Sequence, residues 1–320
     1  DGQTGPSIGT TESGISTVGG LVGHYTTVTD ASGRKMRYLK NVYGQLVRVD
    51  EPVDGNDLGS LAEPTQPTSY KYDVNGRLTK IQQGQQKRFF MYDSLGRLIR
   101  TRQPEQDVNL ALNTDGNPEN DQWTAGYTYD IYGNVQTVTD AKGTVITNTY
   151  DKAGRATSVT YSDPNGTPSI NYYYDGTGLG LSQPPQYSRG KLTKVSNGVS
   201  DSRYTAFDNL GRLQESQQVT DGQTYNFQYK YDPTGNLIET WYPSGRIVKS
   251  FFDAEGGLSS VSSKSAGDPF RNYASNFDYN AFGGLRAVKL GNGLWETAVL
   301  DDRRQLTQIG LGNSPSDTSA

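Results

Sequence analysis

The stretch Tyr92-Asp93-Ser94-Leu95-Gly96-Arg97-Leu98 contains the pattern that decides the fold of this 320-residue chain. An aromatic residue is followed by Asp, two free positions and Gly, and then by Arg and an aliphatic residue. Asp at the first position of a four-residue turn accepts hydrogen bonds from the backbone ahead of it. Gly at the fourth position adopts a positive φ at little steric cost. The pattern therefore predicts a β-hairpin that turns tightly and continues through a bulge.

The same pattern recurs along most of the sequence. Asp-x-x-Gly occurs eleven times, and eight of these units begin with an aromatic residue. Self-similarity of this kind is the signature of a repeat architecture. The turn residues that we single out are Asp73, Gly76, Asp93, Gly96, Asp130, Gly133, Asp151, Gly154, Asp208, Gly211, Asp232 and Gly235. The packing aromatic residues that precede them are Tyr72, Tyr92, Tyr129, Tyr150, Phe207 and Tyr231.

The segments between the turns have the character of strands. Phe227, Tyr229 and Tyr231 alternate with other residues, so their rings share one face of a strand. Turns about ten residues apart leave roughly six residues per strand, and no stretch has a sustained helical period. The sequence predicts an all-β antiparallel ribbon, spiralling or solenoid-like, with loops inserted near 103–122 and 176–188. We expect each Arg after the Gly to lie over a neighbouring strand, stacked on a ring or paired with the Asp of the adjacent repeat.

The composition narrows the class of protein further. Hydrophobic residues make up only 32% of the chain and 22 residues are Tyr, while the mean hydropathy is −0.72. Tyr can bury its ring while its hydroxyl forms a hydrogen bond. This favours a thin sheet whose two faces are both partly exposed to solvent over a β-sandwich. The net charge of −4 argues against nucleic acid as a partner, and no apolar run is long enough to span a membrane. Cysteine is absent.

We find no pattern that predicts catalysis. His24 is the only histidine and is most simply structural, and carboxylates that recur at equivalent turns have a repeated structural role. The oxygen-rich segments 54–57 and 113–121 lack the glycine and glutamate positions of an EF-hand. Segment 176–180 is glycine-rich but is not followed by the Lys-Ser/Thr of a phosphate-binding loop, and Tyr172–Tyr174 fit sheet packing better than sugar stacking. We therefore predict no catalytic, cofactor-binding or metal-binding residue, and no cofactor.

The repeated unit resembles the YD repeat of bacterial Rhs proteins. The same repeat is found in the BC component of Tc toxins, in wall-associated bacterial proteins and in teneurins. The resemblance runs from about Thr29 to Leu306, and Trp241-Tyr242-Pro243-Ser244-Gly245-Arg246 is similar to a proline-containing variant of the unit. It implies a β-sheet ribbon that spirals into a hollow shell, which in some members encloses a toxic C-terminal domain. We recognise neither an Rhs-type terminator nor a toxin domain, so we expect wall material rather than cleavage or toxicity.

These observations lead to a division of the chain and a set of functional hypotheses. We expect a Gly/Ser/Thr-rich N-terminal segment at 1–28 that docks, a YD-repeat array at 29–309 and a polar tail at 310–320. The leading hypothesis is a non-catalytic structural module that forms a bacterial extracellular or cell-surface shell or a self-assembling fibre. One alternative is a wall segment of a toxin-encapsulating Rhs shell, and another is a glycan-binding adhesin. Partners would then be further copies, as homo-oligomer or polymer, the remainder of a larger Rhs-type chain, or glycans.

Overall fold

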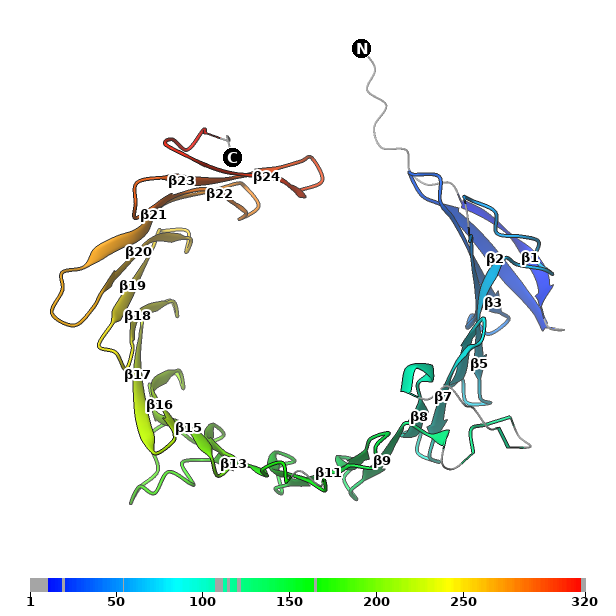
Figure 1. Ribbon diagram of the computed structural model, residues 1–320, viewed down its shortest axis with the longest axis horizontal. Helices are drawn as coiled ribbons and strands as arrows, with labels where there is room; N and C mark the ends of the chain where they lie inside the picture. Colours follow the sequence, from blue (N-terminus) through cyan, green and yellow to red (C-terminus); the bar gives the residue numbers. More distant parts are fainter. Residues whose placement is uncertain are drawn as a thin grey trace, which may run out of the picture. The chain divides into compact units, whose positions relative to one another are not determined.

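The computed structural model describes residues 11–18, 21–53, 55–106, 112–113, 116–119, 122–163 and 166–317. Apart from one short 3-10 turn, η1 (Pro104–Gln106), the regular structure of these residues consists of β-strands (Figure 1). The chain divides into two compact units, the first holding 1–155 and 160–167 and the second holding 156–159 and 168–320. The predicted all-β antiparallel ribbon is confirmed.

In the first unit every two consecutive strands pair antiparallel. This arrangement follows from hairpin turns alone and needs no crossover connection. Its strands are β1 (Thr11–Val18), β2 (Leu21–Thr29), β3 (Lys35–Asn41), β4 (Leu46–Glu51), β5 (Gln66–Tyr72), β6 (Leu78–Gln83), β7 (Gln86–Tyr92), β8 (Leu98–Arg102), β9 (Ala125–Tyr129), β10 (Val135–Thr139) and β11 (Val145–Tyr150).

The second unit repeats the same meander, beginning with the first residues of β12 (Ala156–Tyr161). Its further strands are β13 (Ile170–Tyr174), β14 (Leu192–Ser196), β15 (Ser200–Phe207), β16 (Leu213–Thr220), β17 (Gln223–Tyr231), β18 (Leu237–Trp241), β19 (Ile247–Phe252), β20 (Leu258–Lys264), β21 (Arg271–Tyr279), β22 (Leu285–Leu290), β23 (Trp295–Leu300) and β24 (Leu306–Gly312).

Because consecutive strands run in opposite directions, every second hairpin of a meander lies at the same margin of the sheet. The aromatic-Asp turns join an odd-numbered strand to the next even-numbered one, as between β5 and β6 or between β17 and β18. In each unit they therefore form a row along one margin, which we call the turn margin. The opposite margin carries short turns and longer loops, including segments 52–65 and 103–124.

The long insertions leave the strand order intact. Across 103–124, β8 still pairs with β9 through Thr101 and Ala125, and the Thr124 backbone N–H donates to the Thr101 carbonyl at 2.9 Å. The insertion after Asp175 lies at the turn margin, where sequence alone suggested a turn ending at Gly178. Instead Asp175 Oδ1 accepts the backbone N–H of Gly190, so the turn closes after the insertion. The prediction of added loops is confirmed, but the partner glycine is a different one.

The apolar core is thin, as the composition predicts. The buried apolar side chains of the described residues are few and scattered: Leu39, Val49, Leu58, Phe89, Phe207, Ala287 and Val288. One polar cluster is also buried, since Asp50 lies between Arg37 and Arg48, with an oxygen 2.7 Å from the Nε of each. Both guanidinium groups donate to carbonyls of the loop 52–65, which is thereby fastened over β3 and β4.

Regular structure continues beyond the segment boundaries expected from sequence. Position 28 falls inside β2, which pairs with both β1 and β3, and position 309 falls inside β24. After β24 the chain folds back, and the Thr297 hydroxyl on β23 donates to the Asp317 carbonyl at 3.0 Å.

Candidate functional site: the clasp between successive turns

The turn at Asp93 shows how the repeated residues work. Its backbone N–H donates to the Arg97 carbonyl at 2.9 Å and its own carbonyl accepts from Gly96 at 3.0 Å. One carboxylate oxygen, Oδ1, accepts the N–H groups of Leu95 and Arg97. Gly96 has a φ of +84°, a conformation that other residues adopt at a cost. The φ values of the equivalent glycines are also positive: Gly76 +81°, Gly133 +91°, Gly154 +76°, Gly211 +74° and Gly235 +103°.

The arginine that follows the glycine links its own turn to the next one. Arg212 Nε donates to Oδ2 of Asp208 at 2.6 Å, and its Nη1 donates to the backbone carbonyl of Asp232 at 3.0 Å. The guanidinium carbon lies 4.8 Å from the centre of the Tyr231 ring. Cation–π contact of this kind is attractive even when partly exposed. The carboxylate partner is thus the aspartate of the same repeat, and the neighbouring repeat contributes its carbonyl.

The same contacts recur in the first unit. Arg77 pairs with its own aspartate, donates to the Asp93 carbonyl at 3.0 Å and lies 5.1 Å from the centre of the Tyr92 ring. Arg97 lies 4.6 Å from the centre of the Tyr129 ring, although the insertion 103–124 separates these two residues in sequence. The contact between consecutive turns therefore does not depend on the length of chain between them.

The tyrosine hydroxyl completes the connection. Tyr129 is half-buried, and its hydroxyl donates to the carbonyl of Leu98, the residue after Arg97, at 2.6 Å. We call the arginine of one turn together with the tyrosine and the aspartate carbonyl of the next the clasp. Hydroxyl-to-carbonyl bonds of the same type are made by Tyr72 to Leu46, Tyr92 to Leu78, Tyr150 to Val135, Tyr174 to Ala156 and Tyr279 to Leu258.

The electrostatics of the turns follow from these hydrogen bonds. Backbone donation from Arg77, followed by its side chain, holds the pKa of Asp73 below its usual range. Side-chain donation from Thr234, then from Asn236, lowers the pKa of Asp232 to about 2. Burial raises the pKa of the Tyr129 hydroxyl. These carboxylates are therefore held ionised as hydrogen-bond acceptors, and this arrangement gives no paired acid and base for catalysis.

The clasp is incomplete at several steps. Phe207 is buried but has no hydroxyl, and Asn134 takes the place of arginine after Gly133. The Asn134 side-chain amide donates to the carboxylate of its own turn, Asp130, at 2.9 Å, and it is shorter than the arginine that spans to the next turn elsewhere. The Asn236 amide likewise reaches its own Asp232 at 2.9 Å, and it also donates to the Thr234 hydroxyl at 2.9 Å.

Some turns of the same backbone form depart from the Asp-x-x-Gly pattern. Asn41 accepts the N–H groups of Tyr43 and Gln45, so Asn replaces Asp as the acceptor, and an Asn-x-x-Gly search would have found it. The turn after Asp301 has lost its glycine, yet Arg304 takes the positive φ of +64° and its guanidinium carbon lies 3.7 Å from the centre of the Phe282 ring. Leu290 begins a turn without an Asp or Asn at its first position; the turn is closed by backbone bonds and by the Asn292 side chain, whose Oδ1 accepts the Leu294 N–H at 3.0 Å.

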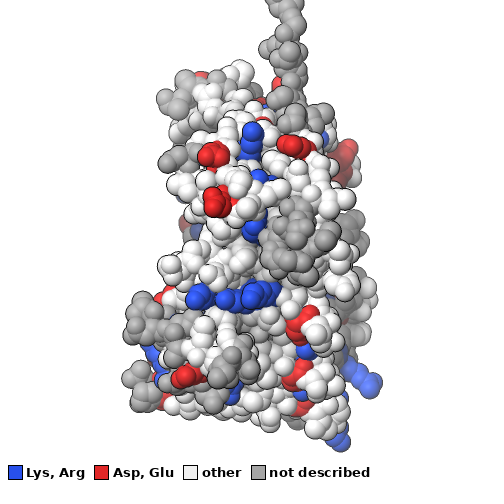
Figure 2. All heavy atoms as spheres, turned by 90° about the vertical axis from the view of Figure 1, so that its right-hand side faces the viewer, with Lys and Arg blue, Asp and Glu red and all other residues white. Residues whose placement is uncertain are grey.

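The other candidates from sequence have ordinary surroundings. His24 is exposed on β2, and Tyr172–Tyr174 are half-buried within β13. Parts of the oxygen-rich segments 54–57 and 113–121 lie outside the described residues. In the described part of the chain no cluster of His, Cys, Asp and Glu is suited to a metal ion, and no helix is long and apolar enough to cross a membrane. Acidic and basic side chains are interspersed on the face drawn in Figure 2.

Comparisons with known proteins agree with this geometry. Residues 53–179 match the family model described as Teneurin YD-shell, which confirms the resemblance to YD-repeat proteins. Among curated proteins no match was found. The crystal structure of TcdB2-TccC3 without its hypervariable C-terminal region is similar at a TM-score of 0.69 and 15% identity over 91% of this chain. The Photorhabdus luminescens Tc holotoxin pore with a mutated TccC3 is similar at 0.72 and 16% over 93%. This chain covers 16% of either solved chain.

Proposed function

Starting from the YD-shell match, we propose that this chain is a non-catalytic wall segment of a YD-repeat shell located outside a bacterial cell. The observation that supports this most strongly is the clasp, because wherever it is complete it fixes one turn to the next while leaving the intervening loops free to vary. A wall needs this combination of uniform connection and tolerance of insertions. The likeness in fold to Tc toxin shell proteins supports the same assignment.

The edge strands indicate how such a segment would be extended. Among the described strands, β1 pairs only with β2 and β24 only with β23. The side chains of Ile309 and Leu311 lie on the same face of β24 and are 57% and 50% exposed, and Ile15 on β1 is 80% exposed. Open edges with exposed apolar side chains are templates for further strands. We propose that the rest of a larger Rhs-type chain supplies those strands.

The same open edges favour a second form, in which copies of this chain pair edge to edge as a fibre. Light scattering over a range of concentrations and electron microscopy of the purified chain test both forms. We expect concentration-dependent association that is weakened by Ile309→Lys with Leu311→Lys. The control Ile131→Lys changes a residue that is 91% exposed on a turn, and it should associate like the wild type. Regular filaments would indicate the fibre, whereas a monomer at every concentration would contradict both forms.

A further inference from the structure

The complete clasps define a place for a guanidinium group on the turn margin. At the step from Asp208 to Asp232, the guanidinium of Arg212 is held by the carboxylate of its own turn, by the Tyr231 ring and by the Asp232 carbonyl. Arg77 occupies the equivalent place one step before Asp93. The chain itself therefore shows which three groups surround a bound guanidinium.

At the next step of the second unit these three groups are present without an arginine. Asp232 supplies the carboxylate, Phe252 supplies the ring, and Asp253 supplies the carbonyl. The residue in the arginine position is Asn236, whose amide donates within its own turn, to Asp232 and to the Thr234 hydroxyl. Within the described part of the chain no cation lies over the Phe252 ring, and the bond that the Asp253 carbonyl accepts is the turn bond from Gly256 at 3.2 Å. In the complete clasp at Asp93, the carbonyl accepts both a turn bond and an arginine.

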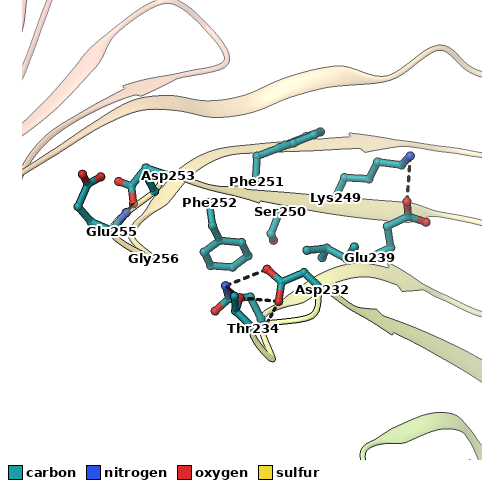
Figure 3. Close-up of a pocket in the computed structure, with 13 residues that line it drawn as sticks. Asp232, Thr234, Glu239, Lys249, Ser250, Phe251, Phe252, Asp253, Glu255 and Gly256 are labelled. Atoms are coloured by element: carbon teal, nitrogen blue, oxygen red, sulfur yellow. Dashed lines mark hydrogen bonds and ion pairs between the residues drawn. The ribbon is translucent and has the colours of Figure 1, made fainter. Parts of the chain in front are cut away.

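A groove of 760 Å³ opens at this incomplete clasp and is lined by Asp232, Asn236, Phe252 and Asp253, among others. In Figure 3 the Phe252 ring points toward the Asp232 turn, and Asp253 and Glu255 lie at one end of the groove. The volume is within the range of roughly 300–1,000 Å³ in which proteins hold small ligands. It exceeds what one guanidinium fills, so the stem that carries the group fits as well.

The charges around the groove favour a cation. Asp232, Glu239, Asp253 and Glu255 contribute carboxylates against the single ammonium of Lys249. That ammonium is already engaged, since Nζ lies 3.0 Å from Glu239 Oε1 and 4.9 Å from the centre of the Phe270 ring. A planar guanidinium can lie flat on the Phe252 ring and direct N–H groups to a carboxylate and a carbonyl at once, which a compact ammonium cannot do equally well.

We propose that this groove binds a guanidinium group from outside the chain, carried on an arginine side chain of a peptide segment. The bound group would take the place that Arg212 occupies one step earlier. The inference rests on the geometry of the second unit and does not depend on whether the chain is a wall segment.

Nuclear magnetic resonance titration of the whole chain with N-acetyl-arginine amide tests the proposal, with N-acetyl-citrulline amide as the uncharged analogue of equal shape. We expect the arginine compound to shift the backbone amide signals of Phe252 and Asp253, and the citrulline compound to bind at least tenfold more weakly. Equal binding of the two compounds, or shifts spread elsewhere on the chain, would overturn the proposal.

Two variants place the binding at the groove. Asn236→Arg supplies the missing guanidinium from within, so it should reduce binding of the arginine compound at least tenfold. The matched control Asn134→Arg makes the same change at an incomplete clasp that does not line this groove, so the shifts of Phe252 and Asp253 should be unchanged. If Asn236→Arg does not fold, Phe252→Leu removes the ring and should weaken binding several-fold. Undiminished binding by a folded Asn236→Arg or Phe252→Leu variant contradicts the assignment.

Discussion

Tyr129 is the residue at which the clasp across the insertion 103–124 can be tested most directly. Tyr129→Phe removes only the hydroxyl, which donates to the Leu98 carbonyl at 2.6 Å. A hydrogen bond of this kind contributes about 0.5–1.5 kcal/mol to stability. We therefore expect the free energy of unfolding to fall by about 1 kcal/mol, with no change in the packing of the ring.

The ring itself is tested by pairing it with Arg97, whose guanidinium carbon lies 4.6 Å from the ring centre. A partly exposed cation–π contact contributes about 0.5–1 kcal/mol. In a double-mutant cycle, Arg97→Met and Tyr129→Leu should therefore show a coupling energy of about 0.5–1 kcal/mol. Arg97→Met combined with Tyr129→Phe should show much less coupling, because an aromatic ring is present at position 129 whether the residue is Tyr or Phe.

Urea unfolding at equilibrium measures each free energy. The control is Tyr132→Phe, since Tyr132 lies only three residues away on the turn and is 82% exposed; its stability should equal that of the wild type. Equal stability of Tyr129→Phe and Tyr132→Phe, together with zero coupling to Arg97, would show that the clasp contributes nothing here. In that case the strands alone would connect the repeats across the insertion.

Three further outcomes are expected. Gly96→Ala should destabilise the chain by about 1–2 kcal/mol because φ is +84°, while Gly126→Ala, with only Thr139 Cβ nearby at 3.9 Å, should change little in urea unfolding. Asp50→Asn should lower the free energy of unfolding by about 3–5 kcal/mol, since it leaves two buried guanidinium groups without their counter-charge; a loss below about 1 kcal/mol would mean that the cluster is hydrated. The pKa of Asp232 is lowered to about 2, so its carboxylate stabilises the fold above the usual pKa near 4, and this contribution is lost as the pH falls toward 2. The midpoint of thermal unfolding should therefore shift to lower temperature over that pH interval. A constant midpoint would contradict this prediction.

The parts of the fold that sequence predicts are those with local causes. Asp93 and Gly96 determine their turn because both the acceptor and the positive φ lie within four residues. Strand length followed from turn spacing in the same way. The partner of Arg97 was harder to predict, because the ring over which it lies is fixed by the pairing of strands on either side of an insertion. Its carboxylate proved to be that of its own turn, which the spacing from Asp93 to Arg97 already allowed.

Other features leave little trace in the sequence. Nothing in the sequence indicates that the charged residues of β3 and β4 are buried: Arg37, Arg48 and Asp50. They are buried because the loop 52–65 folds over them. The groove at Asn236 is visible in the sequence merely as a break in the Gly-Arg pattern. Such a break has no meaning until the clasp is known, because the clasp defines what is missing.

The order of the strands has a mechanical consequence. In each unit every strand is hydrogen-bonded to its neighbours in sequence. Tension applied at the end of β24 therefore breaks its hydrogen bonds to β23 one after another. Little force is needed for such peeling, and each hairpin that leaves lengthens the chain by a small, regular step. Tension applied along the strands, from one margin to the other, instead loads all the bonds of a strand pair at once and meets their combined resistance. A sheet of this construction is stiff along its strands and yields readily when drawn out from its end.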